Sequence, residues 1–235
     1  MLAAIVFDFD GVIADTEPLH LAGFRDVLAA RGLALTDAEY YDRYLGYDDA
    51  GAFRAMGADR GRPWDDADVR ELVVEKAERL RHLTAHLRLL FPGAADAIRR
   101  AAAHVPIAIA SGALRHEVTG VLVREGLAEL FTVIVAAEDV GRSKPSPDPY
   151  AAAVARLGSS TGRPIAPPQC VAIEDSLWGL QSAKAAGLRT VAVGQTYGAS
   201  ELTEADLVLH GLGELDIPAL EALVAAGTEG ANPPR

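Results

Sequence analysis

The chain has 235 residues, half of them hydrophobic and 23% charged; this length and composition predict a packed α/β domain with room for a smaller insertion and exclude a disordered chain. A formal net charge of −11 at pH 7 disfavours nucleic acid or an anionic membrane as the main partner. The sequence has a single cysteine, so no internal disulfide can form. Its N-terminal apolar run has no basic flank, and no apolar run is long enough to span a bilayer. We therefore expect a cytoplasmic protein.

The first predicted element is a buried strand at residues 2–9, and no convincing strand follows it before residue 90. The intervening chain has charged, helical patterns with glycines near their ends. The helices predicted there are residues 19–30, 38–45, 49–59 and 66–83.

From residue 94 onward, apolar runs alternate with helical patterns. The predicted helices are residues 94–103, 114–125, 148–157, 177–186 and 218–226, and the predicted strands are residues 106–110, 132–136, 170–173, 190–193 and 207–209. This alternation is typical of right-handed β-α-β units in a parallel sheet. We therefore expect a Rossmann-like α/β core formed by residues 1–15 and 91–227, a helical insertion at residues 16–90, and a flexible tail at residues 228–235.

Two carboxylates end the first predicted strand. Asp8 and Asp10 are two residues apart, so in extended chain they face the same side, toward the crevice where open α/β sheets bind ligands. Two carboxylates this close require a cation or a proton between them. The alternative is a simple turn at the strand end, since aspartate and glycine are common turn residues.

Three further polar segments follow other predicted strands. Ser111 and Gly112 precede a helix, which predicts an anion site or a simple helix cap. Lys144 lies in a proline-rich loop, where it is either a fixed cation for a phosphate or a surface lysine. Glu174 and Asp175 offer hard oxygen ligands that suit Mg2+, although a helix cap would explain one of the two. Because all the segments lie at carboxyl ends of predicted strands, one crevice should collect them.

These residues resemble motifs of the haloacid dehalogenase superfamily of phosphohydrolases, in the subgroup of β-phosphoglucomutase and many sugar-phosphate phosphatases. The matching strings are residues 7–12, 15–20, 111–112, 144–145, 173–179 and 183–187. The resemblance implies that Asp8 attacks phosphorus and becomes an aspartyl phosphate. It also implies that Asp10 protonates the leaving oxygen and then activates water.

The remaining site residues are assigned by the same resemblance. Ser111, Gly112 and Lys144 would bind the phosphoryl oxygens. Mg2+ would be held by Asp175 with Glu174 beside it, by Asp8, and by the backbone carbonyl of Asp10. The helical insertion would be a cap that closes over the crevice.

Two cap residues are weaker candidates for substrate contact. His20 is located where the family often has a histidine, and Lys76 lies on a predicted cap helix; for each, the alternative is a solvated helix residue. The loop at residues 45–51 departs from the phosphomutase pattern because it has Asp48 and Asp49 where an arginine is usual. Those acids would repel a distal phosphate, unless a nearby arginine compensates; the candidates are Arg43, Arg54 and Arg115.

We therefore predict a Mg2+-dependent phosphatase, monomeric or a small homo-oligomer, that acts on a small phosphorylated metabolite, with a sugar phosphate as the candidate substrate. The alternative is a hexose-phosphate phosphomutase, in which the aspartyl phosphate meets a sugar hydroxyl instead of water. A dehalogenase is disfavoured because that branch needs no metal and normally lacks the second aspartate. A non-catalytic scaffold on the same fold is disfavoured by the complete set of motifs.

Overall fold

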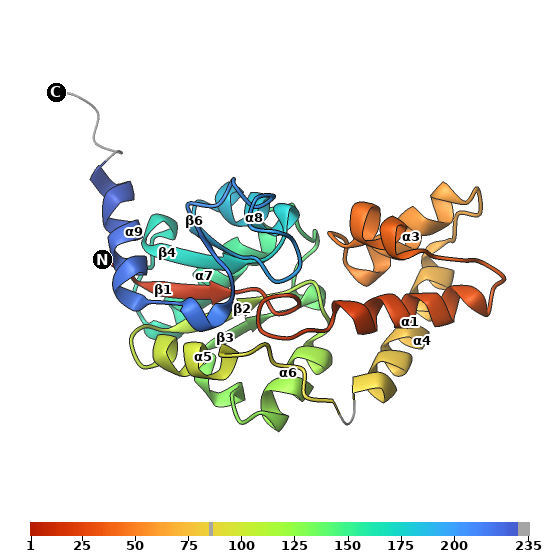
Figure 1. The fold of residues 1–235 in the computed structure, drawn as a ribbon, viewed down its shortest axis with the longest axis horizontal. Helices are drawn as coiled ribbons and strands as arrows, with labels where there is room; N and C mark the ends of the chain where they lie inside the picture. Colours follow the sequence, from red (N-terminus) through yellow and green to blue (C-terminus); the bar gives the residue numbers. More distant parts are fainter. Residues whose placement is uncertain (85–86, 230–235) are drawn as a thin grey trace. The chain divides into compact units, whose positions relative to one another are not determined.

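The structure is a computed structural model that describes residues 1–84 and 87–229. Within them, six strands form one parallel sheet in the order β3-β2-β1-β4-β5-β6 (Figure 1). The strands are β1 (Ala4–Phe7), β2 (Ile107–Ala110), β3 (Val133–Val135), β4 (Cys170–Glu174), β5 (Arg189–Val193) and β6 (Leu207–Leu209). Ile5 of β1 pairs with Ile107 of β2 and with Val171 of β4. The predicted parallel α/β fold is confirmed.

Helices connect the strands and cover the sheet. They are α5 (Ala94–Ala102), α6 (Arg115–Arg124), α7 (Asp148–Thr161), α8 (Leu177–Ala185) and α9 (Ile217–Glu229). One face of β1 carries Ala4 and Val6, which pack with side chains of α7 and α8 in a hydrophobic cluster. The opposite face carries Ile5 and Phe7, which are also fully buried. Burial of both faces explains why the strands are continuous apolar runs.

The first strand is shorter than the predicted residues 2–9. After Phe7 the chain turns, and the carbonyl of Phe9 accepts hydrogen bonds from the amides of Ile13 (2.9 Å) and Ala14 (3.0 Å). Gly11 allows this reversal because its φ of 73° lies in the left-handed region. The turn leaves Asp8 and Asp10 beyond the carboxyl end of β1.

The contacts divide the chain into two compact units, one formed by Met1–Ala14 with the chain from Leu90 onward, and one formed by Asp15–Leu89. The second unit is helical, with α1 (Glu17–Ala29), α2 (Asp37–Glu39), α3 (Asp49–Asp59) and α4 (Asp66–Thr84). Its own core contains Phe24, Phe53 and Met56, and the rings of Phe24 and Phe53 are 4.9 Å apart.

The helix predicted at residues 38–45 and the tail predicted at residues 228–235 also differ from the structure. The helix expected at residues 38–45 is the short α2, started by a capping box between Thr36 and Glu39, followed by a π-helical turn at Tyr40–Tyr44. Residues 228 and 229, expected to belong to the flexible tail, are helical, because α9 extends to Glu229. A glycine such as Gly227 weakens a helix by about 1 kcal/mol relative to alanine, which is too little to end one that is otherwise favoured. The rest of the predicted tail, residues 230–235, lies outside the described residues.

Across the described ranges, no helix combines the length and hydropathy needed to cross a bilayer.

Candidate active site

The loop after β1 places two aspartates at the edge of the sheet. The amide of Asp8 donates to the carbonyl of Ile173 on β4 (2.9 Å), which ties Asp8 to the neighbouring strand. The amide of Phe9 donates to Asp8 Oδ1 (2.7 Å). Asp10 is half-buried, and its Oδ2 lies 3.4 Å from the hydroxyl of Ser111. The structure therefore brings the first two polar segments together.

Lys144 joins the first and last polar segments. Its Nζ lies 2.8 Å from Asp8 Oδ2 and 2.7 Å from Glu174 Oε1, and only 10% of its side chain is exposed. Lys144 is therefore a fixed cation inside the site and not a surface lysine. This position suits it to neutralise charge on a phosphoryl group bound next to Asp8.

Both carboxylate oxygens of Glu174 accept hydrogen bonds. Oε1 accepts from Lys144 Nζ and from the hydroxyl of Tyr150, each at 2.7 Å. Oε2 accepts from the amide of Asp175 (3.1 Å) and from the amide and hydroxyl of Ser176 (3.4 and 3.3 Å). The carboxylate is fully buried, and this donor set fixes its orientation.

The charges around Asp8 shift two pKa values. Burial and the neighbouring Glu174 raise the pKa of Asp8 well above its usual range, against the opposing effect of Lys144. Burial alone would lower the pKa of Lys144, but Asp8 and Glu174 raise it above its usual value. Lys144 therefore stays charged, while Asp8 needs a further positive charge or a proton.

Three carboxylates form a candidate cation site. Asp8, Glu174 and Asp175 are all buried, and each offers an oxygen within 4.8 Å of the others. Hard oxygen ligands of this kind suit Mg2+, and one ammonium cannot offset three buried carboxylates. The residues therefore fit a divalent cation. The side chain of Asp10 is outside this group, which is compatible with the expectation that only its backbone carbonyl contributes.

The two residues predicted to bind phosphate, Ser111 and Gly112, differ in how closely the protein encloses them. Ser111 is 2% exposed, and its hydroxyl oxygen accepts from the amide of Ala113 (2.9 Å). Gly112 faces open space, since a Cβ added there would meet no atom within 4 Å. Ser111 is thus fixed beside Asp10, and the chain at Gly112 is left accessible to a ligand.

In the helical unit, the two candidate cap residues contact each other. Lys76 is fully buried, and its Nζ lies 2.5 Å from His20 Nδ1 and 2.6 Å from Asp49 Oδ1. The alternative of solvated helix residues is therefore wrong for both His20 and Lys76. Asp49 Oδ2 is buried and has no hydrogen-bond partner in the part of the chain that the structure describes.

The three arginines that could have compensated for Asp48 and Asp49 already have carboxylate partners. Arg43 pairs with Asp59 (2.6 Å), Arg54 pairs with Asp66 (2.9 Å), and Arg115 pairs with Asp139.

Four residues of the site were missed by sequence reasoning. Gln195 Nε2 donates to the carbonyls of Gly11 and Val12 (2.8 and 3.0 Å), and Thr196 lies against Gly11. Both follow the carboxyl end of β5, so the rule that found the other segments could have found them. Tyr150 and Gly179 lie within helices and do not follow a strand end, although Gly179 closes the matching string at residues 173–179. Burial, together with Glu174 and Asp8, raises the pKa of the Tyr150 phenol well above its usual range, which keeps it a donor.

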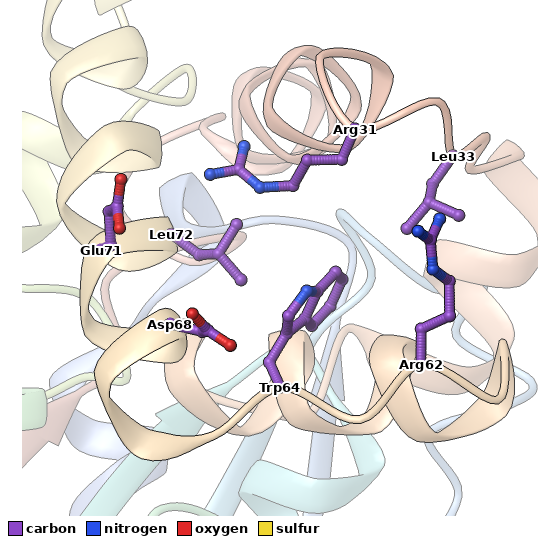
Figure 2. A pocket seen from close by; sticks show the side chains of 7 residues that line it. All are labelled: Arg31, Leu33, Arg62, Trp64, Asp68, Glu71 and Leu72. Atoms are coloured by element: carbon purple, nitrogen blue, oxygen red, sulfur yellow. The ribbon is translucent and has the colours of Figure 1, made fainter.

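The helical unit also has a surface pocket of about 240 Å³ (Figure 2). It is lined by Arg31, Leu33, Arg62, Trp64, Asp68, Glu71 and Leu72. The guanidinium groups of Arg31 and Arg62 point apart (Figure 2), and Arg31 pairs with Glu75 at 2.9 Å. With two cations and two anions in its wall, this pocket has no net positive charge for a phosphate, unlike the site around Lys144.

The chain is similar to known proteins in sequence and in fold. A model of the haloacid dehalogenase-like hydrolase family matches residues 5–193. The protein CbbY of Rhodobacter capsulatus is 34% identical over 211 residues, which cover 83% of this chain and 87% of that protein. Fructose-1-phosphate phosphatase YqaB of Escherichia coli K12 is 32% identical over 203 residues, 81% of this chain and 96% of that protein.

A solved structure of a CbbY variant from Rhodobacter sphaeroides in complex with xylulose 1,5-bisphosphate is also similar. It has 31% sequence identity and a TM-score of 0.82, and the match covers 94% of this chain and 99% of that one.

Proposed function

This chain belongs to the haloacid dehalogenase-like hydrolase family, and on that premise we propose that it is a Mg2+-dependent phosphatase of small sugar phosphates. The observation that carries the proposal is the position of Asp8. Its carboxylate lies at the end of the central strand β1, 2.8 Å from the ammonium of Lys144 and within one group of buried carboxylates. A carboxylate nucleophile beside a fixed cation is the arrangement that phosphoryl transfer through an aspartate requires.

In the first step, a carboxylate oxygen of Asp8 attacks phosphorus and the bond from phosphorus to the ester oxygen breaks. Asp10 donates a proton to the departing oxygen, and the products are the sugar and an aspartyl phosphate. In the second step, Asp10 removes a proton from a water molecule, which attacks the same phosphorus. The bond from Asp8 to phosphorus breaks, which releases inorganic phosphate and restores the carboxylate.

Charge neutralisation supports both steps. Lys144 and Ser111 would hold the oxygens of the transferring group, together with the backbone at Gly112. Asp8, Glu174 and Asp175, with the carbonyl of Asp10, would hold Mg2+, which supplies positive charge to the phosphoryl oxygens. The contacts of Ser111 with Asp10 and of Lys144 with Asp8 keep each group in place before substrate arrives.

The helical unit, Asp15–Leu89, is proposed as the cap that determines substrate choice. Its buried Lys76 is already paired with Asp49 (2.6 Å), and a neutralised cation has little attraction for a second phosphate. This pairing favours a monophosphate over a hexose bisphosphate, and hydrolysis over a mutase reaction.

The test is phosphate release from a panel of sugar phosphates by the purified chain, with Mg2+, with Ca2+, and with excess chelator. The panel includes fructose 1-phosphate, glucose 6-phosphate, β-glucose 1-phosphate and xylulose 1,5-bisphosphate. One relative is named as a fructose-1-phosphate phosphatase, and a similar solved structure contains xylulose 1,5-bisphosphate. We expect Mg2+-dependent release, with monophosphates preferred. Conversion of glucose 1-phosphate to glucose 6-phosphate without phosphate release would favour the mutase instead.

The matched variants are Asp8→Asn and Asp26→Asn. Asparagine at residue 8 keeps the volume but cannot form the acyl phosphate, so turnover should fall below a few per cent of the parent, a loss of about 2 kcal/mol or more. Asp26 is an exposed residue of α1, and its variant should keep full activity. Borohydride trapping followed by mass spectrometry should locate the intermediate on the peptide that contains Asp8; a trapped peptide without Asp8 would contradict the assignment.

A further inference from the structure

Tyr150 is a fully buried side chain of α7 with one polar contact. Its hydroxyl donates to Glu174 Oε1 at 2.7 Å, and within residues 1–84 and 87–229 no other hydrogen bond of this hydroxyl is found. The ring lies in the hydrophobic cluster between the sheet and α7, where a phenylalanine would fill the same space. The hydroxyl is therefore not needed for packing, and its one partner belongs to the active site.

The contact of Tyr150 extends to Lys144. Glu174 Oε1 accepts from both Tyr150 and Lys144, and the ammonium of Lys144 also lies 5.3 Å from the centre of the Tyr150 ring. The ring face attracts a cation at this distance. Tyr150 is thus linked to Lys144 in two ways: indirectly through the shared oxygen Oε1 of Glu174, and directly through its ring.

We propose that Tyr150 is a positioning residue for phosphoryl transfer, which fixes the carboxylate of Glu174 through its hydroxyl and thereby fixes the ammonium of Lys144. The inference rests on the proposed phosphatase function. Tyr150 touches neither substrate nor metal in this role, and it acts only through the two groups that it holds.

Loss of the Tyr150 hydroxyl should weaken stabilisation of the transition state more than it weakens binding of phosphate. A flexible lysine can follow the charge of a ground-state phosphate. The five-coordinate transition state is stabilised only by groups that are already in position. Loss of the Tyr150 hydroxyl should therefore lower kcat while KM changes little.

The test compares Tyr150→Phe with Val154→Ala in the Mg2+-loaded protein. Val154 lies on the same helix and in the same hydrophobic cluster, so its variant controls for a general loss of core stability. With p-nitrophenyl phosphate as substrate, we expect Tyr150→Phe to lower kcat about tenfold and to change KM by less than about threefold. Val154→Ala should keep the parent kcat.

Titration calorimetry provides a second measurement that does not need turnover. In Tyr150→Phe, vanadate, which adopts five-coordinate geometry, should lose about tenfold in affinity and inorganic phosphate less than about threefold. The binding stoichiometry counts folded sites and should equal that of the parent.

The inference is overturned if kcat and the vanadate affinity of Tyr150→Phe stay within about twofold of the parent. It is also overturned if the stoichiometry falls in parallel with kcat, or if Val154→Ala loses as much kcat. A parent protein without phosphatase activity would instead refute the proposed function, and the ratio of vanadate to phosphate affinity would still decide the role of Tyr150.

Discussion

Gly11 and Gly179 leave the space that two site carboxylates occupy. A Cβ at Gly11 would lie 1.9 Å from Asp175 Oδ2, and one at Gly179 would lie 1.9 Å from Glu174 Oε1. The two positions differ in backbone conformation, since Gly11 has a positive φ whereas Gly179 lies within α8. Gly179 is therefore the cleaner probe of the space around Glu174, because alanine is otherwise favourable in a helix.

Substitution Gly179→Ala should displace Glu174 and release its donors, Lys144 and Tyr150. We expect kcat/KM to fall on the order of 100-fold, about 2.7 kcal/mol, with no loss of helix propensity. The control is Gly120→Ala on α6, where an added Cβ meets no atom within 4 Å. Steady-state kinetics and thermal unfolding of both variants measure the effect, and full activity of Gly179→Ala would show that Glu174 does not need its present position.

At the scale of elements, a buried ion pair links two helices of the helical unit. Asp49 begins α3 and Lys76 lies in the middle of α4, and the ammonium of Lys76 also lies 4.8 Å from the centre of the Phe24 ring on α1. A buried ammonium without a carboxylate is costly. The pair therefore fixes how α3 packs on α4, in addition to any contact with substrate.

Substitution Asp49→Ala should destabilise the protein by about 3 kcal/mol, at the low end for a broken buried pair. The neighbouring Asp48→Ala removes only a helix cap, in which Asp48 Oδ1 accepts from the amide of Gly51 (2.7 Å), and should cost about 1 kcal/mol. In the double variant Asp49→Ala/Lys76→Met, stability should partly recover, because no unpaired charge remains. Urea unfolding measures all three, and equal losses for Asp48→Ala and Asp49→Ala would contradict the role of the pair.

At the scale of the whole molecule, part of the excess negative charge is buried in one place. The chain has a formal charge of −11, and Asp8, Glu174 and Asp175 face a single ammonium. Without a metal, the folded state lowers this repulsion by retaining a proton on Asp8, whose pKa is raised by burial and by Glu174. Folding and proton binding are therefore coupled.

The coupling predicts how stability depends on pH. The raised pKa of Asp8 means that the folded state binds more protons than the unfolded state. The stabilisation is complete below the usual carboxyl pKa of about 4 and is lost as pH rises toward the folded-state pKa. In chelator, the Tm of Asp8→Asn should rise relative to that of the parent as the pH is raised from 4, because the variant has no carboxyl group to deprotonate.

Mg2+ should reverse this loss. The parent should gain more Tm from Mg2+ at pH 8 than at pH 5, because only the deprotonated site binds a cation, and Asp8→Asn should gain less at both. A parent whose Tm is independent of Mg2+ at pH 8 would contradict the metal site.

The sequence by itself determined the order and type of most elements and the place of the polar segments. Apolar period and length are local properties, so they predicted all six strands of the sheet within about two residues at each end, a usual margin for such boundaries. The rule that parallel strands present their carboxyl ends at one edge is enough to group Asp8, Asp10, Ser111, Lys144 and Glu174 from the sequence alone.

Only the tertiary structure decided which side chains contact one another. Tyr150 and Glu174 are 24 residues apart, and Lys76 and His20 are 56 apart. The residues of these pairs have no local sequence pattern that distinguishes them from ordinary core or surface residues. Tyr150 has the spacing of a core residue, and Lys76 lies on a charged helix whose pattern predicts exposure to solvent. Their contacts depend on how separate helices and strands pack, because burial and charge pairing are properties of the assembled core and not of the chain nearby.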